Sequence, residues 1–164
     1  MATITSILST DLISDSRDTI NTNFANINAD TPVLVYKSAD ETVNNSTTLQ
    51  DDDELLFAVA ANEVWAFKLI FNFNSGTTPD IKYAFSIPAG ATIDGYSLDV
   101  GSVNESSVIN SSGGGANTRV AVLHANIINS TTAGNMQIQW AQNTQDASDT
   151  TVLKGSYIIA HKLA

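Results

Sequence analysis

The sequence contains no cysteine. This absence excludes a disulfide framework, thiolate metal ligands and a cysteine nucleophile. The chain also has no run near the ~18 apolar residues that a membrane-spanning helix needs. Its N-terminus, MATITSILSTDLISDSRD, lacks the basic start and the continuous apolar stretch of a secretory signal. We therefore expect a soluble protein that does not insert into a membrane.

Basic residues are scarce. Seven Lys and Arg stand against 17 Asp and Glu, which gives a net charge of -10. A surface this acidic repels phosphate groups and does not release the counterions that drive nucleic-acid binding. The charge therefore predicts no nucleic-acid partner.

Charged residues of both signs are also few, at 15% of the chain against the ~25% of a typical globular protein. Ser, Thr and Asn fill the gap and make up 51 of the 164 residues. These residues suit turns and strand faces better than helix interiors. With 43% of residues hydrophobic, the chain can bury a core instead of staying disordered. The composition favours a mainly β protein.

The first thirty residues are an exception to this β composition. Ser14 to Ala29 carries the helical pattern of one apolar seam, with spacings of four, three, four and three between its members. The seam consists of Ile13, Arg17, Ile20, Phe24 and Ile27. Ser14 or Asp15 can cap such a helix at its N-terminus.

This predicted helix is only about two heptads long, which is too short to be stable alone in water. It must pack against copies of itself, against another protein or back onto its own domain, and the seam does not decide among these. We take residues 1–30 as an N-terminal arm for attachment and oligomerisation, and residues 31–164 as a β-sandwich domain.

Beyond Asp30 the hydrophobic period changes from helical to two. Two segments alternate most clearly, and each predicts a strand with one aromatic, buried face. The first face holds Trp65, Phe67, Leu69, Phe71 and Phe73, and the second Ile81, Tyr83, Phe85 and Ile87. Lys68 and Lys82 fall on the opposite faces. The turn-forming residues 74–79 between the segments predict an antiparallel hairpin.

Further strands are predicted at 33–37, 55–60, 91–100, 119–128, 135–141 and 151–163. About eight strands with Gly, Asn and Ser loops, and no helices between them, indicate an antiparallel β-sandwich. The predicted fold is a mainly β, jelly-roll-like sandwich with a short N-terminal helix.

The densest charge cluster is Asp51-Asp52-Asp53-Glu54. Four carboxylates could help to bind Ca²⁺, but consecutive residues point in different directions and the run lacks the glycine of a calcium loop. We interpret it as a solvated acidic turn before the strand at Leu55, and we predict no metal site.

His124 and His161 are the only histidines. Neither has a serine or acidic neighbour at the spacing of a known triad, and each lies on a predicted strand face. The sequence offers no convergent set of polar groups for catalysis. We therefore expect no enzymatic activity, no catalytic residue and no cofactor.

Two regions resemble proteins of tailed phages. Residues 15–28, DSRDTINTNFANIN, resemble the N-terminal segment of many phage fibre and appendage proteins. The body resembles a β domain common in tailed-phage virion proteins. The matching stretches are YKS at 36–38, TTLQDDDEL at 47–55, AVAAN at 58–62, IQWAQN at 138–143 and GSYI at 155–158.

This resemblance implies a homotrimer on the virion surface, made in the host cytoplasm. The N-terminal segment would attach to capsid or tail proteins, and the β domain would face outward, with a host-surface glycan as a further candidate partner. The length of 164 residues fits a head decoration or head fibre as well as a short tail fibre. The alternative is a carbohydrate-binding β-sandwich module, for which Trp65 and Trp140 are the candidate aromatics.

Overall fold

The computed structural model describes residues 3–8, 10, 12–29, 31–98, 101–115 and 117–164. Within these residues the chain forms one helix and twelve strands. They are α1 (Ile13–Ala29), β1 (Val33–Tyr36), β2 (Glu41–Val43), β3 (Gln50–Val59), β4 (Val64–Ser75), β5 (Ile81–Ser86), β6 (Thr92–Ser97), β7 (Gly101–Asn104), β8 (Ile109–Ser111), β9 (Arg119–Ile128), β10 (Gly134–Gln142), β11 (Thr150–Val152) and β12 (Tyr157–Lys162). The predicted class, a mainly β protein with one short N-terminal helix, is confirmed.

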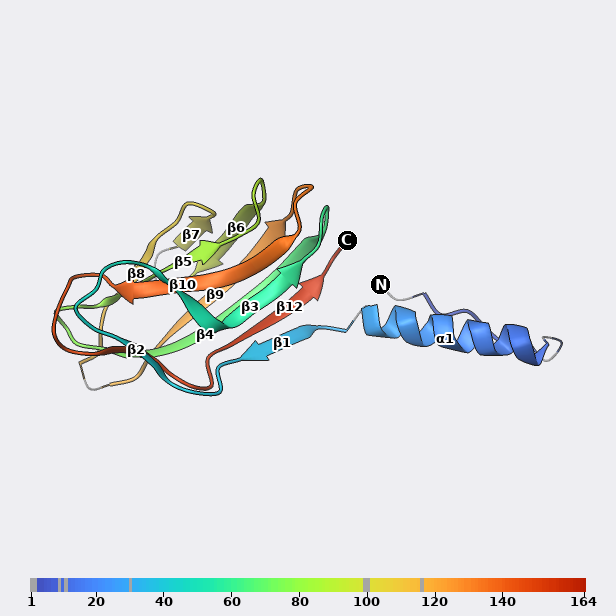
Figure 1. Cartoon of the computed structure of the whole chain (residues 1–164), viewed down its shortest axis with the longest axis horizontal. Coiled ribbons are helices and arrows are strands. Elements are labelled where there is room, and N and C mark those ends of the chain that lie inside the picture. The colour runs from blue at the N-terminus through green and yellow to red at the C-terminus, as the bar shows by residue number, and fades with distance from the viewer. Residues whose placement is uncertain (1–2, 9, 11, 30, 99–100, 116) are drawn as a thin grey trace.

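The strands form two antiparallel sheets that face each other as a sandwich (Figure 1). The larger sheet has the order β1-β12-β4-β9-β6-β7, with β11 beside β4 and β2 beside β11. The smaller sheet has the order β3-β10-β5-β8. From β3 to β10 the chain crosses between the sheets at every connection except β6 to β7. Strands β3, β5, β8 and β10 lie in the smaller sheet, and β4, β6, β7 and β9 lie in the larger one.

The predicted hairpin between the two aromatic strands is wrong. β4 pairs with β9, β11 and β12 in the larger sheet, whereas β5 pairs with β10 and β8 in the smaller one. Residues 74–79 therefore carry the chain across the sandwich. Alternation shows which residues share a face but not which strand lies alongside, so the two aromatic faces meet across the core. The rings of Phe71 and Tyr83 lie 5.2 Å apart between centroids.

The core follows the predicted alternation. Every member of the Trp65-to-Phe73 face is buried, as are Ile81, Tyr83 and Phe85, while Ile87 packs partly buried against them. Lys68 and Lys82 lie on the outer faces of their sheets and are half-buried. Burying side chains of this size contributes about 1.5–3 kcal/mol each, so these two faces make a large contribution to the stability of the sandwich.

The observed strand boundaries agree best with the predicted ones where the alternation of apolar and polar residues is longest. β9 covers the predicted residues 119–128, and β1, β6 and β10 match predicted strands closely. β3 begins at Gln50, five residues before the predicted strand 55–60. The predicted strand 151–163 is instead two strands, β11 and β12, separated by a turn in which Gly155 has a φ of 83°. The short strands β2, β7 and β8 were not predicted. Asp99 and Val100, at the end of the predicted strand 91–100, lie outside the described residues.

Gly95 allows strands β6 and β9 to come unusually close. A Cβ atom at this position would lie 2.5 Å from the Cβ of Ala125 and 2.5 Å from the carbonyl oxygen of His124. Since real Cβ atoms do not approach other atoms so closely, any larger residue here must push β6 away from the larger sheet.

Candidate functional site

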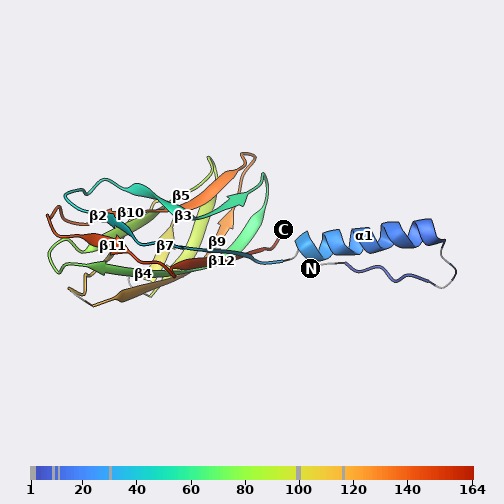
Figure 2. The same ribbon diagram turned by 60° about the horizontal axis from the view of Figure 1, so that its bottom comes forward.

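Helix α1 projects from the end of the sandwich at which β1 begins, and does not fold back onto either sheet (Figures 1 and 2). The amide of Ser16 donates a hydrogen bond to the carbonyl of Leu12 (2.9 Å), so the cap position falls at Leu12. The predicted cap at Ser14 or Asp15 is wrong, because the helix begins at Ile13 and the Ser14 hydroxyl bonds to the Asp15 carboxylate instead. Asp15 still lies in the first turn, where the helix dipole favours an anion.

The predicted seam runs along this projecting helix and remains exposed in the single chain. Its apolar side chains range from 41% exposed for Ile20 to 91% for Ile13, with Phe24 at 63%. Arg17 is exposed as well. A short helix gains most of its stability from burying such a stripe, and nothing in the described part of the single chain covers it.

Residues 3–8 run back along the helix and cover a neighbouring face (Figure 2). The Asn23 side chain accepts a bond from the Thr5 amide (2.9 Å) and donates one to the Thr5 carbonyl (3.0 Å). The Asn26 side chain donates to the Thr3 carbonyl (2.7 Å). These asparagines lie on the polar side of α1, beside the seam. The arm is therefore a helix with an extended segment attached, and Ile4, Ile7 and Leu8 of that segment add exposed apolar surface.

The first strand after the helix is fixed to the sandwich by a buried lysine. Lys37, which follows β1, is 2% exposed, and its ammonium lies 2.6 Å from Glu41 Oε2 and 2.9 Å from Asp52 Oδ2. Burial by itself would lower the pKa of Lys37, but the hydrogen bonds to Glu41 and Asp52 and their charges outweigh it and raise the pKa. One cation thus links the end of β1 to β2 and β3.

This cluster also corrects the interpretation of Asp51–Glu54 as a solvated turn. All four residues belong to β3, at a point where its register with β10 shifts. Asp52 is fully buried, and its Oδ1 accepts the amides of Glu54 and Leu55. The cation beside this carboxylate is the chain's own Lys37. The sequence signal that was overlooked is a lysine ending the apolar strand Val33–Tyr36.

Glu54 has a separate role at the surface. Its carboxylate accepts the hydroxyl of Ser38 and the Ser38 amide. The bond from the Ser38 hydroxyl is the main reason that the pKa of Glu54 lies below its usual value. Across the described residues, no group of three or more His, Asp or Glu side chains could hold a metal ion.

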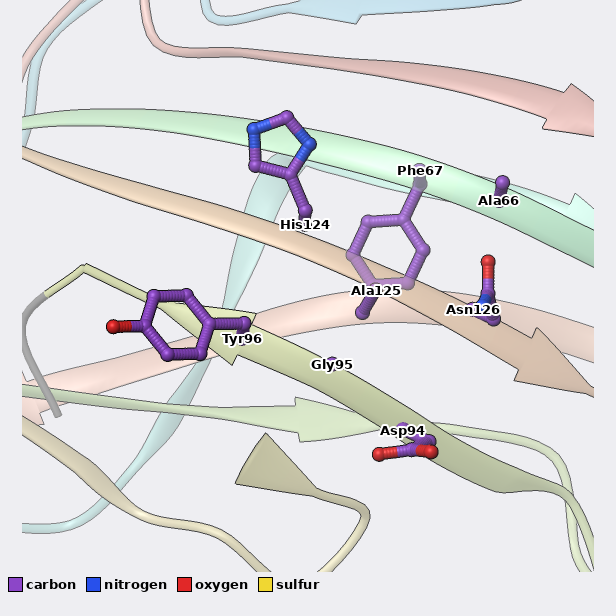
Figure 3. Close-up of a pocket in the computed structure, with 8 residues that line it drawn as sticks. All are labelled: Ala66, Phe67, Asp94, Gly95, Tyr96, His124, Ala125 and Asn126. Carbon is purple, nitrogen blue, oxygen red and sulfur yellow. The ribbon is translucent and has the colours of Figure 1, made fainter. Parts of the chain in front are cut away.

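Both histidines lie on the outer face of the larger sheet and are exposed, His124 on β9 and His161 on β12. His124 borders an open depression of about 410 Å³. Figure 3 shows the side chains that line it, which come from β4, β6 and β9. They are Ala66, Phe67, Asp94, Gly95, Tyr96, His124, Ala125 and Asn126. The small residues Ala66 and Gly95 leave room there, and Asp94, Tyr96, His124 and Asn126 supply hydrogen-bonding groups.

The two tryptophans are core residues. Trp140 is fully buried in β10, and Trp65 is 8% exposed, with its indole N–H donating to Glu63 Oε2 (2.9 Å). Neither can stack on a sugar at the surface. In the described part of the chain, no helix is long and apolar enough to cross a membrane.

No protein-family model matches the chain, and no curated protein matches it. Among solved structures it is similar to the tripod from the baseplate of bacteriophage Tuc2009, at 15% identity over 98% of this chain and 99% of that one, with a TM-score of 0.36. It is also similar to a chain of infectious bursal disease virus, Gx strain, at 10% identity over 82% of this chain and 41% of that one, with a TM-score of 0.27. Scores this low do not establish a shared fold, so the function is argued from the chain itself.

Proposed function

We propose that this protein is a self-associating structural protein that attaches through its N-terminal arm and presents a β-sandwich. The observation that carries the proposal is the exposed seam of Ile13, Ile20, Phe24 and Ile27 on a helix that projects from the sandwich. A solvent-exposed stripe of large apolar side chains is costly unless another surface covers it.

The composition of the seam favours three copies. Ile13, Ile20 and Ile27 are spaced seven residues apart and occupy one core position of the heptad, and Arg17 and Phe24 occupy the other. Isoleucine at this core position shifts coiled coils toward trimers or tetramers when the other core position is also aliphatic, and here Phe24 supplies one apolar side chain at that other position. Together with the trimer implied by the sequence resemblance, this makes a homotrimer our proposed state.

We further propose that the particular role is that of a virion protein of a tailed phage, such as a head decoration, a head fibre or a short tail fibre. Residues 15–28 and the stretches of the β domain that resemble phage appendage proteins support this role. The crossings between the two sheets from β3 to β10 support the jelly-roll-like arrangement that we propose, a fold common in viral capsid domains. The proposal gives the chain no catalytic role and no cofactor.

Under this proposal residues 1–30 bind a capsid or tail protein, and the sandwich lies at the virion surface. Neither tryptophan can supply a surface aromatic for adhesion to a host glycan, because both are buried.

Imaging of particles labelled with an antibody against the sandwich tests the role. Label at regular positions on the head or at the tail is the expected result, and the position distinguishes a decoration from a fibre. A virion role would be contradicted if the cells express the chain but the particles purified from them carry neither the label nor the chain.

A further inference from the structure

The two outer faces of the sandwich differ sharply in chemistry. The outer face of the smaller sheet is largely polar, with Asp51, Gln137 and Gln139 across β3 and β10 and Lys82 and Ser86 on β5. This is the usual surface of a strand that faces water. The larger sheet is different.

An apolar row crosses four strands on the outer face of the larger sheet. Tyr36 of β1 lies opposite Tyr157 of β12, which lies opposite Ile70 of β4, which lies opposite Val122 of β9. Leu98, whose amide bonds to the Val122 carbonyl (3.0 Å), continues the row past the end of β6. Tyr36 and Leu98 are 62% and 68% exposed.

A second row lies beside the first and is mixed. It joins Leu34, Ile159, Lys68, His124 and Tyr96 in register across β1, β12, β4, β9 and β6. Leu34, Ile159 and Tyr96 are exposed. Large apolar side chains in neighbouring positions on adjacent strands form a patch, which differs from the isolated exposed hydrophobics of an ordinary surface.

The same face is poor in negative charge, although the chain carries 17 Asp and Glu. On β1, β12, β4 and β9 no outward position that the structure describes is acidic, and the charged or titratable groups are Lys68, His124, His161 and the two tyrosines. Asp94 on β6 is the first carboxylate, at the margin. Copies of a chain with a net charge of -10 repel each other, so they can approach most closely through a face with few carboxylates.

The position of this face relative to the arm also selects a second copy as the occupant. β1, which contributes Leu34 and Tyr36, begins four residues after the end of α1. Helices that associate through their seams therefore bring their β1 strands near one another. The apolar rows begin on that strand and extend away from it across the sheet.

We propose that the outer face of the larger sheet, defined by the rows Tyr36–Leu98 and Leu34–Tyr96, packs against a second copy of this chain. This inference rests on the self-association in the proposed function and extends it from the helix to the sandwich. The sandwiches of one oligomer then contact each other directly and are not joined only through their associated α1 helices.

The absence of cysteine in the chain allows a direct test by thiol labelling. Ile159→Cys places a thiol in the patch, and Ala58→Cys places one at an exposed outward position of β3 on the opposite face. Each full-length variant is reacted with a maleimide at high chain concentration. It is also reacted at a dilution where light scattering gives the mass of one chain.

We expect the thiol of Ile159→Cys to react at least tenfold more slowly in the oligomer than in the single chain at dilution. The thiol of Ala58→Cys should react at the same rate in both states. An oligomer in which both thiols react at their single-chain rates overturns the sheet contact and leaves association through the helix intact. A chain that is monomeric at every concentration overturns both. Phe24→Ser distinguishes the two surfaces further. If this variant no longer forms the oligomer, while the thiol at position 159 is protected in the chain with Phe24, then the helix is required for association in addition to the sheet contact.

A charge variant supplies an independent test that does not depend on thiol reactivity. Val122→Glu should raise the concentration at which the oligomer dissociates at least tenfold, whereas Ala58→Glu should leave it unchanged. Circular dichroism checks that both variants fold. Equal dissociation of the two variants contradicts the proposal, and so does a patch that is protected by a different protein while the isolated chains remain apart.

Discussion

Lys37 couples the two sheets of the sandwich, since its buried ammonium touches carboxylates from β2 and β3. Replacing it with methionine leaves the fully buried Asp52 without a cation. We expect Lys37→Met to lower the free energy of unfolding by about 3–5 kcal/mol, the range for breaking one side of a buried pair. Urea unfolding at fixed chain concentration measures the loss.

Two controls accompany this substitution. Lys82→Met, on the outer face of the smaller sheet, should cost under about 0.5 kcal/mol. Adding Asp52→Asn to Lys37→Met should restore part of the loss, because a neutral amide oxygen can still accept the amides of Glu54 and Leu55. If Lys37→Met and Lys82→Met are equally mild, the buried pair does not stabilise the fold.

Glu63 gives the molecule an acid-sensitive contact. Burial by itself would raise the pKa of this carboxyl, but bonds from Lys162, the Trp65 indole and the Ala60 amide outweigh burial and lower it. A lowered folded-state pKa stabilises the fold above the unfolded pKa, and this stabilisation is lost as the pH falls through the folded-state pKa. We therefore expect the urea concentration at the unfolding midpoint to decrease once the pH falls below about 4.5, the usual pKa of a glutamate carboxyl.

Glu63→Gln should make that acid decline shallower and change the fluorescence of Trp65, whose indole bonds to the carboxylate. The exposed Glu105→Gln is the matched control. An acid decline of the same slope in the parent and in Glu63→Gln would show that this contact does not titrate with folding.

At the scale of the elements, long alternation and helical spacing were predictable from sequence, whereas partners in space were not. β9 and α1 emerged close to their observed bounds because each carries an uninterrupted period. The placement of β4 and β5 in different sheets could not be foreseen, since a buried aromatic face has the same sequence pattern in a hairpin and in a crossover. Similarly, the burial of Asp52 depends on Lys37, fifteen residues earlier, and on a register shift that no local pattern signals.

Substitutions in helix α1 test whether its apolar seam holds copies of the chain together. Phe24→Ser removes the largest side chain of the seam, and Thr22→Ser changes an exposed residue of the same helix outside it. We expect light scattering to give three times 17.4 kDa for the parent and Thr22→Ser, and a smaller mass for Phe24→Ser at micromolar concentration. A parent chain that stays at 17.4 kDa with its sheets folded would rule out the trimer.

At the scale of the whole molecule, we expect the sandwich to fold by itself and the arm to attach the protein. The core is built from strands between β1 and β12, and none of residues 13–27 of α1, whose side chains the structure describes, is part of it. The sandwich should therefore fold without the arm, while attachment should require it. The acid-poor face of the larger sheet lies between these roles, since it starts on the strand that the arm leads into.

Deletion of residues 1–29 tests the central claim of attachment through the arm most directly. Particles are assembled in cells that supply either the full chain or the shortened chain, and the amount bound per purified particle is measured with an antibody against the sandwich. We expect the shortened chain to keep its β-type circular dichroism and to be absent from particles that carry the full chain at normal occupancy. A shortened chain that is found on particles at the same occupancy would contradict the account.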